Sequence, residues 1–593
     1  MELLRHIFTF NASEPLLFTQ FYFWAFFAIV FTLFACIKNR ILLRNAFLFA
    51  VSLFFYYKTS GIFLLLLVFS VLANYLLAIA IYATRKELHR KLLLVLSVIV
   101  DLGVLCYFKY AYFFVDITNS IFGTHYSIVE QIILPVGISF FTFQTLSYVI
   151  DVFRRRIEPV RNVLNFGFYV SFFPQLVAGP IVRATDFVPQ LYKPYSLTRR
   201  YFGIAVFWIL NGLAKKIILS DYLAVNFIDR VFQNPLLFSG FENLMALLVY
   251  SLQVYADFSG YTDIAIGVAM VMGFYLPKNF NSPYKATNCG NFWKRWHISL
   301  SKWLQDYLYI PLGGNRNATF GTFFWVALIA MTGVLLSGSW VIAAIVFGIA
   351  AAIIIWGIFV PAKRQRIFTN LNLMVTMLLG GMWHGASFNF IIWGGLNGVG
   401  IVVCKIWKEL TIYAKTAVVL AVFFGIALLC NFAPAPLWNM LAIWVGVVAL
   451  GTLVRLIGHF CHLSWNWLDT AWGVAQTFFF ISFTRLFFRA SSNLNPAEAN
   501  RMAWETAQNM VHQIGSEWNV SLIPDICSAY WKVFLVFALG MIIHWLPEHW
   551  KRWYRYNFAV MPLPLMAVVA AVVIFVVYQF VTAELQAFIY FQF

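Results

Sequence analysis

One histidine, His384, stands in a stretch that is suited to chemistry. The stretch "GGMWHGASFNFIIWGG" (380–395) holds no other ionisable side chain among its small, apolar and aromatic residues. A lone histidine on an apolar face is most often held by a local hydrogen bond, so a structural role is one interpretation. Two features favour a functional role. The glycines beside the ring let a ligand or another backbone approach, and ionisable residues inside membrane segments commonly mark functional sites.

A second histidine, His297, lies in the stretch "NFWKRWHISLSKWLQDYLYIPLGG" (291–314), which combines tryptophans with basic residues. Polar residues recur there at helical spacing and predict one polar helix face, made up of Lys294, His297, Ser301 and Gln305. One interpretation is an interfacial helix whose cations bind lipid headgroups. The other is the mouth of a site for an anionic donor such as a coenzyme A thioester, with Lys294, Arg295 and Lys302 beside its phosphates.

Two further stretches place polar residues inside apolar segments. Gln144, Ser147 and Asp151 share one face of a predicted helix, where they either hydrogen-bond to neighbouring helices or contact a substrate. Asp257 and Asp263 are six residues apart, a spacing that does not suit a pair of carboxylates working together. Each of them either pairs with a lysine or arginine or faces a cavity.

No metal site is predicted. The stretch "HFCH" (459–462) contains two histidines and a cysteine, but no second pair of ligands lies near it in the sequence. A cluster at the end of a membrane span is the preferred interpretation. The sequence also lacks an HExxH motif, a GxSxG nucleophile elbow and a P-loop.

The composition indicates a membrane protein. Of the 593 residues, 62% are hydrophobic and 11% are charged, whereas soluble proteins carry about 25% charged residues. Apolar runs of about 20 residues, enough for a helix to cross a bilayer, recur along the chain. The net charge of +18 comes from basic residues between the apolar runs. It indicates cytoplasmic loops and attraction to anionic lipids in preference to nucleic acid.

The order of these segments predicts how they are arranged. The basic segments 85–91 and 154–161 are expected on the cytoplasmic side, while 111–131 contains no lysine or arginine and is expected outside. Between 200 and 320, prolines and glycines interrupt short apolar pieces, which is tolerated in a membrane only where protein or a water-filled cavity covers the backbone. We therefore expect an all-α polytopic protein with roughly eleven to thirteen membrane segments, including re-entrant or half-spanning helices around a central cavity.

Several stretches together resemble the membrane-bound O-acyltransferase family. They are "PVGISFFTFQTLSYVIDVFR", "FFPQLVAGPIVR", "YADFSGYTDIAIG", the stretch around His297, "GGMWHGASFNFIIWGGLNG" and "TRLFFRA". The resemblance is closest to the bacterial branch with alginate O-acetyltransferases and the teichoic-acid D-alanyl transfer protein. It implies N-terminal transmembrane helices in 1–100, an acyltransferase core in 101–490, and a short extramembrane helix followed by transmembrane helices in 491–593.

The resemblance also assigns roles to residues. It implies that His384, in "WHG", is the catalytic residue and that His297 is its companion across the central cavity. Alginate acetyltransferases commonly carry a second histidine where this chain has Asn397, so protonation is not part of that residue's role here. We further expect contributions to substrate binding from Lys294, Arg295, Lys302, Trp296, Trp383 and Asn389.

The function that the resemblance implies is O-acyl transfer, most simply O-acetyl transfer, in a bacterial inner membrane. An acyl thioester such as acetyl-coenzyme A would be the co-substrate, with no permanently bound cofactor. His384 would act as general base, and His297 would stabilise the oxyanion or orient the acceptor. The acceptor would be a hydroxyl of a cell-surface polysaccharide or of an extracytoplasmic relay protein. The alternatives are D-alanyl transfer from a carrier protein to teichoic acid and non-enzymatic transport of a polysaccharide or lipid.

Overall fold

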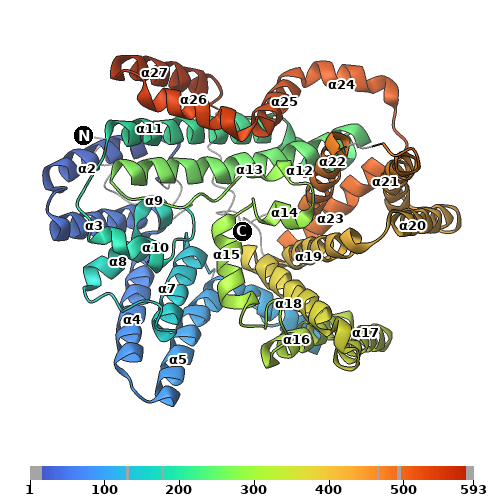
Figure 1. Ribbon diagram of the computed structural model, residues 1–593, viewed down its shortest axis with the longest axis horizontal. Helices are drawn as coiled ribbons and strands as arrows, with labels where there is room; N and C mark the ends of the chain where they lie inside the picture. The colour runs from blue at the N-terminus through green and yellow to red at the C-terminus, as the bar shows by residue number, and fades with distance from the viewer. Residues whose placement is uncertain (1–15, 129–131, 177–178, 464–465, 490–495, 582–593) are drawn as a thin grey trace.

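The computed structural model describes residues 16–128, 132–176, 179–463, 466–489 and 496–581 (Figure 1). Within these residues the regular structure is entirely helical, without strands. Seven helical segments are long and apolar enough to cross a membrane, a bent pair would make an eighth, and four shorter helices are also apolar. The chain is therefore a polytopic all-α membrane protein, and the expected eleven to thirteen segments include pieces shorter than a full span.

The N-terminal part of the chain forms a group of helices at one end of the molecule (Figure 1). Its helices are α2 (Phe21–Ile37), α3 (Ile41–Ser60), α4 (Leu64–Ala83), α5 (Glu87–Leu105), α7 (Ile138–Phe153), α8 (Val163–Ser171), α9 (Phe173–Leu176) and α10 (Ala184–Leu191). Helix α6 (Ala111–Phe122) follows α5 but lies away from this group, beside helices of the second half of the chain. Helix α7 packs against α4 and α5 and is buried on nearly all sides. Its polar residues therefore face other helices in every direction, which requires hydrogen-bond partners for them.

Two long helices cross the centre of the molecule side by side (Figure 1). Helix α11 (Arg199–Ala214) continues through π-helical turns into α12 (Asp229–Gln233), and its partner is α13 (Gly240–Val271). A capping box of Ser239 and Glu242 begins α13. Lysines of the π-helical turn pair with the two carboxylates of α13 that the sequence singled out. The Nζ–Oδ distances are 2.7 Å for Lys215–Asp263 and 2.6 Å for Lys216–Asp257.

The polar stretch that follows α13 does not form the single helix that the spacing predicted. Helix α14 (Cys289–Trp293) ends before His297, and α15 (Ile298–Leu304) begins directly after it. His297 lies between them with a left-handed φ of 42°. The break is fixed by Asn279, whose carbonyl accepts from the Ile298 amide at 2.9 Å and whose side-chain oxygen accepts from the Ser299 amide at 3.1 Å. The expected continuous polar face is therefore wrong, because tertiary hydrogen bonds replace the helical ones.

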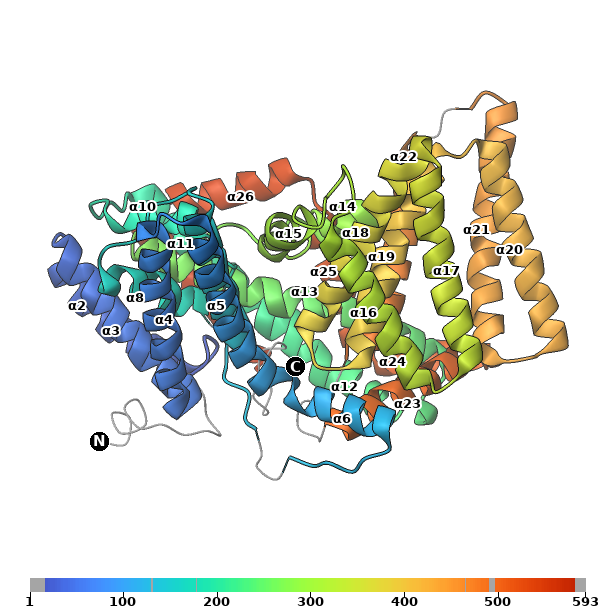
Figure 2. The same ribbon diagram turned by 90° about the horizontal axis from the view of Figure 1, so that it is seen from below.

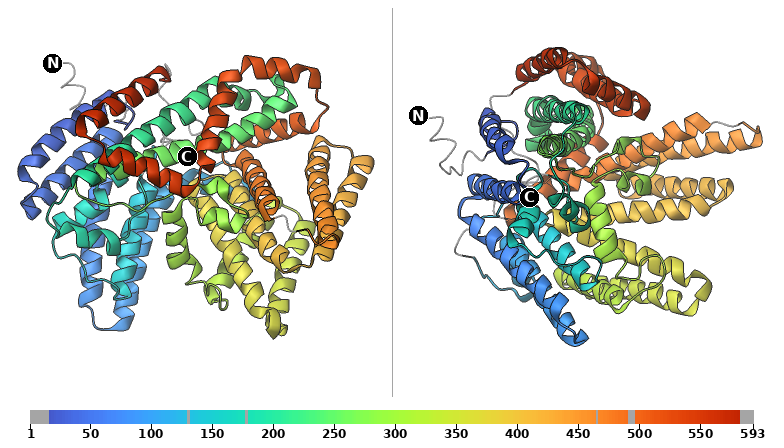
Figure 3. Two further views of the ribbon diagram at one scale, coloured as in Figure 1. Left: turned by 45° about the horizontal axis from the view of Figure 1, so that its top comes forward. Right: turned by 60° about the vertical axis from the view of Figure 1, so that its left-hand side comes forward.

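The second half of the chain forms a further group of helices and returns to the central pair. The group contains α16 (Phe320–Ser337), α17 (Trp340–Phe359), α18 (Pro361–His384), α19 (Phe388–Glu409), α20 (Ile412–Phe432), α21 (Pro436–Phe460) and α22 (Asn466–Thr484). After it come α23 (Pro496–Gly515), α24 (Ile523–Ala529), α25 (Trp531–Trp545), α26 (Glu548–Val560) and α27 (Leu563–Gln579). Helices α26 and α27 run back over α11 (Figure 3). The helix expected after residue 490 corresponds to α23.

Short helices gather at opposite edges of the molecule. Helices α10, α14, α15 and α26 lie toward one edge in Figure 2, and α6, α12, α23 and α24 lie toward the other. The start of α5, with the basic segment 85–91, shares its edge with the basic helix α26, whereas α6 lies opposite. This arrangement agrees with the sidedness expected from the charges, because the basic segment 85–91 and α6 lie at opposite edges.

Candidate active site

The structure brings the two histidines together in the interior. The ring centroids of His297 and His384 lie 6.5 Å apart, and both side chains are buried, with exposed fractions of 0% and 2%. His384 is the last residue of α18, and His297 is the left-handed residue between α14 and α15. Two elements that are distant in the sequence therefore present their imidazoles to one small volume.

The end of α18 is held by side chains that the sequence analysis missed. The Lys109 ammonium donates to the carbonyl oxygens of Trp383 and His384 at 2.7 and 3.1 Å, and the Tyr110 hydroxyl donates to that of Met382 at 2.8 Å. These carbonyls have no partner within their own helix, and a cation there also complements the helix dipole. The only signal in the sequence was one lysine within the apolar run before α6.

Aromatic rings and glycines shape the surroundings of His384. Its ring lies 4.9 Å from Trp383, 5.0 Å from Trp393 and 5.5 Å from Phe488, measured between ring centroids. Helices α18 and α19 pack closely because Gly381 has no side chain. A Cβ atom at that position would lie 2.3 Å from the Phe390 carbonyl oxygen. The glycines of this stretch thus let the two helices meet beside the histidine.

The hydrogen bonds around His297 fix its tautomer. The Asn279 side-chain oxygen accepts from the Ser299 amide at 3.1 Å and from its hydroxyl at 2.9 Å, and it lies 3.2 Å from His297 Nδ1. Because that oxygen can only accept, His297 Nδ1 must carry the hydrogen. The neutral ring then presents its lone pair at Nε2. His297 is thus arranged to accept a hydrogen bond from a hydroxyl, which favours orientation of an acceptor over stabilisation of an oxyanion.

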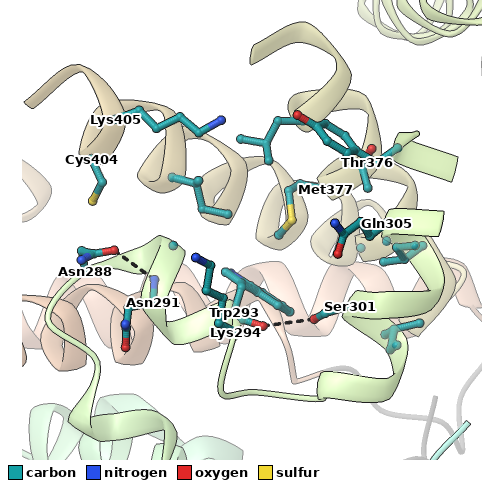
Figure 4. Close-up of a pocket in the computed structure, with 18 of the residues that line it drawn as sticks. Asn288, Asn291, Trp293, Lys294, Ser301, Gln305, Thr376, Met377, Cys404 and Lys405 are labelled. Carbon is teal, nitrogen blue, oxygen red and sulfur yellow. Dashed lines mark hydrogen bonds between the residues drawn. The ribbon is translucent and has the colours of Figure 1, made fainter. Parts of the chain in front are cut away.

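A cavity of about 530 Å³ reaches His384 from between α14–α15 and α18–α19 (Figure 4). We call it the lysine-lined cavity, because Lys294, Lys405 and Lys408 line it. In Figure 4, Lys405 lies on the wall that α19 forms, across the cavity from Lys294. Trp293 and Trp393 supply apolar walls nearer the histidine. The cavity thus runs from cationic groups to an aromatic interior.

A second, small cavity of about 60 Å³ also reaches His384. It is lined by residues 134–140, including Ser139, and by Lys109 and Trp383. Residues 134–140 follow the segment that was expected outside, whereas the lysine-lined cavity adjoins α14 and α15 near the basic edge (Figure 2). His384 is therefore shared by two cavities that approach it from different elements.

The predicted substrate-binding residues occupy different places. Lys294 lines the lysine-lined cavity and Trp383 the small one. Arg295 instead donates to the side chain of Asn291 at 2.6 Å and to the Asn281 carbonyl at 3.1 Å. Lys302 is exposed and does not line either cavity. Roles for Arg295 and Lys302 at the donor stay predictions, whereas Lys405 and Lys408 were missed because they come from a different helix.

The remaining polar residues mostly hold the framework. Trp296 is buried against Arg485. The Arg485 guanidinium lies 4.4 Å from the centroid of the Trp296 ring and 4.9 Å from the centroid of the Phe488 ring. Asn397 donates to the Trp393 carbonyl at 2.8 Å, and Asn389 is buried just after the α18–α19 turn. Arg485, in "TRLFFRA", is thus a buried cation that reaches the aromatic surroundings of His384 through Phe488.

The polar face of α7 makes hydrogen bonds within its own helix and to Tyr307 of a neighbouring element. Asp151 accepts from the Tyr307 hydroxyl at 2.7 Å and lies 3.4 Å from Arg156, while the Ser147 hydroxyl donates to the carbonyl of Gln144 at 2.9 Å. None of the three lines the two cavities that reach His384. The hydrogen-bonding interpretation of this face therefore fits better than substrate contact.

Known proteins with similar sequences include acyltransferases. The model of the membrane-bound O-acyltransferase family matches residues 86–329, a region that includes His297 and ends before His384. The probable alginate O-acetylase of Pseudomonas aeruginosa is 38% identical over 367 residues, which are 61% of this chain and 60% of that protein. The peptidoglycan O-acetyltransferase of Helicobacter pylori is 34% identical over 386 residues, 61% of this chain and 64% of that protein.

A more distant relative is the teichoic acid D-alanyltransferase of Bacillus subtilis. It is 26% identical over 277 residues, which are 46% of this chain and 58% of that protein. The chain thus spans less than two thirds of the length of each of these relatives. Residues 86–329 match the model of the membrane-bound O-acyltransferase family, and the chain is similar to probable alginate O-acetylases and to a peptidoglycan O-acetyltransferase.

Proposed function

We propose that this protein is an O-acyltransferase that moves an acyl group, most simply acetyl, from a thioester donor on the cytoplasmic side to a hydroxyl on the outer side. The single observation that carries the proposal is the position of His384, shared by two cavities that approach from different elements. A residue in that position can act on a donor and an acceptor that never leave their own sides of the membrane.

The lysine-lined cavity suits the donor. Lys294, Lys405 and Lys408 provide positive charge at the edge of the molecule that carries the basic helices, where the phosphates of coenzyme A would bind. The aromatic walls beside Trp293 and Trp393 suit the narrow, uncharged arm of such a thioester. Its carbonyl carbon would then lie beside His384.

The two imidazoles suit the chemistry. A neutral His384 ring would take the proton from the acceptor hydroxyl as its oxygen attacks the thioester carbonyl. The tetrahedral intermediate would collapse with cleavage of the carbon–sulfur bond, and the leaving thiolate would take the proton back from His384. His297, with its lone pair at Nε2, would accept a hydrogen bond from the acceptor and orient it.

The acceptor would be a sugar hydroxyl of an extracytoplasmic polysaccharide, reached directly or through a relay protein. The names of the relatives with 34–38% identity point to O-acetylation of alginate and peptidoglycan, whereas the D-alanyltransferase relative is more distant at 26%. The expected location is the bacterial inner membrane. The segments between the membrane helices offer little surface for gripping a polymer, so we also expect an extracytoplasmic acyl-handling partner.

The proposal is tested with purified protein and acetyl-coenzyme A labelled in the acetyl group. The label should appear as an alkali-labile ester on a polysaccharide or on a partner protein, with release of free coenzyme A. A transporter would move polysaccharide or lipid without consuming thioester. Movement of a glycan without any release of coenzyme A would contradict the proposal.

A further inference from the structure

A third cavity lies away from both histidines, between the central helices and the C-terminal helices. It has a volume of about 610 Å³, and we call it the C-terminal cavity. One wall comes from α11, α13 and the segment 278–282, and the other from α25, α26 and α27. The C-terminal helices lie outside residues 86–329, the region that matches the family.

Positive charge predominates in this cavity. Four cations line it, Lys215, Lys278, Lys551 and Arg555, against two carboxylates, Asp263 and Glu548. Asp263 forms an ion pair with Lys215. The other three cations make no ion pair with any carboxylate that the structure describes. Burial, and next the ammonium of Lys285, lower the pKa of Lys551 to about 8. Cations gathered in this way repel one another until an anion joins them.

Two of these cations pack against one aromatic ring. Lys278 lies 5.7 Å and Arg555 5.3 Å from the ring of Trp208, measured to the centroid. These two side chains come from a loop after α13 and from α26, so Trp208 of α11 brings together cations from separate parts of the chain. Contact with the ring does not use up the N–H donors of the two cations, which can therefore donate to a group with several acceptor oxygens.

A buried donor adds a second, independent indication. Asn279 is 1% exposed and lines the cavity. Its oxygen is committed to Ser299 and His297, and its Nδ2 has no hydrogen-bond partner among the residues that the structure describes. Burying an amide donor in this way is costly unless an acceptor satisfies it. His544 contributes a further donor to the same cavity, because its Nε2 accepts from the Tyr284 amide at 3.1 Å and the neutral ring therefore carries its hydrogen on Nδ1.

Apolar side chains also line the cavity. They include Ile218 and Leu219, from the turn after α11, Leu539 and Ile543 of α25, and Val576 of α27. Helix α25 belongs to a bent span, and α27 is one of the shorter apolar helices. A ligand that fills the cavity would thus need an anionic head and an apolar body. Basic pockets between membrane helices on the cytoplasmic side commonly bind anionic lipid headgroups.

We propose that the C-terminal cavity is a binding site for a phosphate group carried by an amphiphile, separate from the site of acyl transfer. Lys278, Lys551 and Arg555 hold the phosphate, and Asn279 supplies a neutral donor. Two sources carry this chemistry, the headgroup of an anionic phospholipid and the phosphates of a nucleotide thioester. The bound group joins α26 to the central helices, and through Asn279 it adjoins the hydrogen bond that orients His297.

The experiment measures the melting temperature of the whole, delipidated protein in a neutral detergent. The probes are a short-chain phosphatidylglycerol, the diacylglycerol with the same chains, and coenzyme A. Phosphatidylglycerol should raise the melting temperature saturably, and diacylglycerol should not. Lys278→Gln combined with Arg555→Gln should raise the apparent Kd at least about tenfold, because two charged contacts to phosphate are lost. Arg552→Gln is the matched control, since this exposed arginine lies on the same helix and does not line the cavity.

Each shift is compared with the same variant's own ligand-free melting temperature, so a less stable variant remains informative. A coenzyme A shift that the double variant loses would assign the site to the phosphates of a nucleotide thioester bound apart from the site of acyl transfer, and a phosphatidylglycerol shift that it loses would assign it to lipid. The proposal is overturned if none of the probes produces a saturable shift, or if the shifts in the double variant and in Arg552→Gln equal those of the wild type. Because the readout is binding, the outcome does not depend on acyl transfer.

Discussion

At the scale of single residues, His384 carries the chemistry in this account. We expect His384→Ala to abolish transfer, with a loss of at least about 10²–10⁴-fold from the missing general base alone. The protein should still insert and fold, because Lys109 and Tyr110 hold the backbone carbonyls at the end of α18 and the substitution leaves these in place. Transfer rate and melting temperature are measured together, with His459→Ala, an exposed histidine at the end of α21, as the control. Near wild-type turnover in His384→Ala would remove the catalytic assignment.

His297 should depend on the oxygen that fixes its tautomer. Asn279→Leu removes the acceptor for Nδ1 and should lower kcat about tenfold, the effect of one lost hydrogen bond to a buried group, while the donor KM stays the same. Asn279→Asp keeps an oxygen acceptor and should retain more of the rate. Steady-state kinetics with acetyl-coenzyme A separate the two outcomes. Equal losses in the two variants would mean that Asn279 acts on packing and not on the tautomer.

At the scale of elements, the lysines of α14 and α19 should act on donor binding. Lys294→Gln and Lys405→Gln should each raise the donor KM about three- to tenfold with little change in kcat, the signature of lost uniform binding. The effect should shrink at high salt, because exposed charges are screened over about 8 Å at physiological ionic strength. Lys363→Gln is the matched control, since Lys363 is exposed at the start of α18 and does not line the cavity. A donor KM that changes as much in Lys363→Gln would favour a general charge effect.

Elements also show where sequence reasoning succeeds and fails. Apolar length predicted the membrane helices, and glycine spacing around His384 predicted a close helix contact, because both are local properties of the chain. The break at His297 could not be predicted from 291–314, since Asn279 imposes it from another segment. Lys109 and Lys405 were missed for the same reason. A single lysine in an apolar run reveals nothing of which carbonyl or cavity it will reach.

At the scale of the whole molecule, we propose that an acyl group crosses the membrane at His384. The lysine-lined cavity lies near the basic edge, and the small cavity lies beside the segment after α6. A donor confined to one side should therefore serve an acceptor confined to the other. Transfer across the membrane requires both cavities, because a site open to one side only would serve ordinary transfer within the cytoplasm.

The most direct measurement uses proteoliposomes in which all protein molecules have the cytoplasmic face inward. Labelled acetyl-coenzyme A is sealed inside, and the acceptor polysaccharide with an extracytoplasmic extract is supplied outside. We predict labelled ester on the outer polysaccharide while coenzyme A stays inside, and no label outside in liposomes that carry His384→Ala. Label that reaches only acceptors sealed inside with the donor, or equal outer labelling by wild type and His384→Ala, would contradict transfer across the membrane at His384.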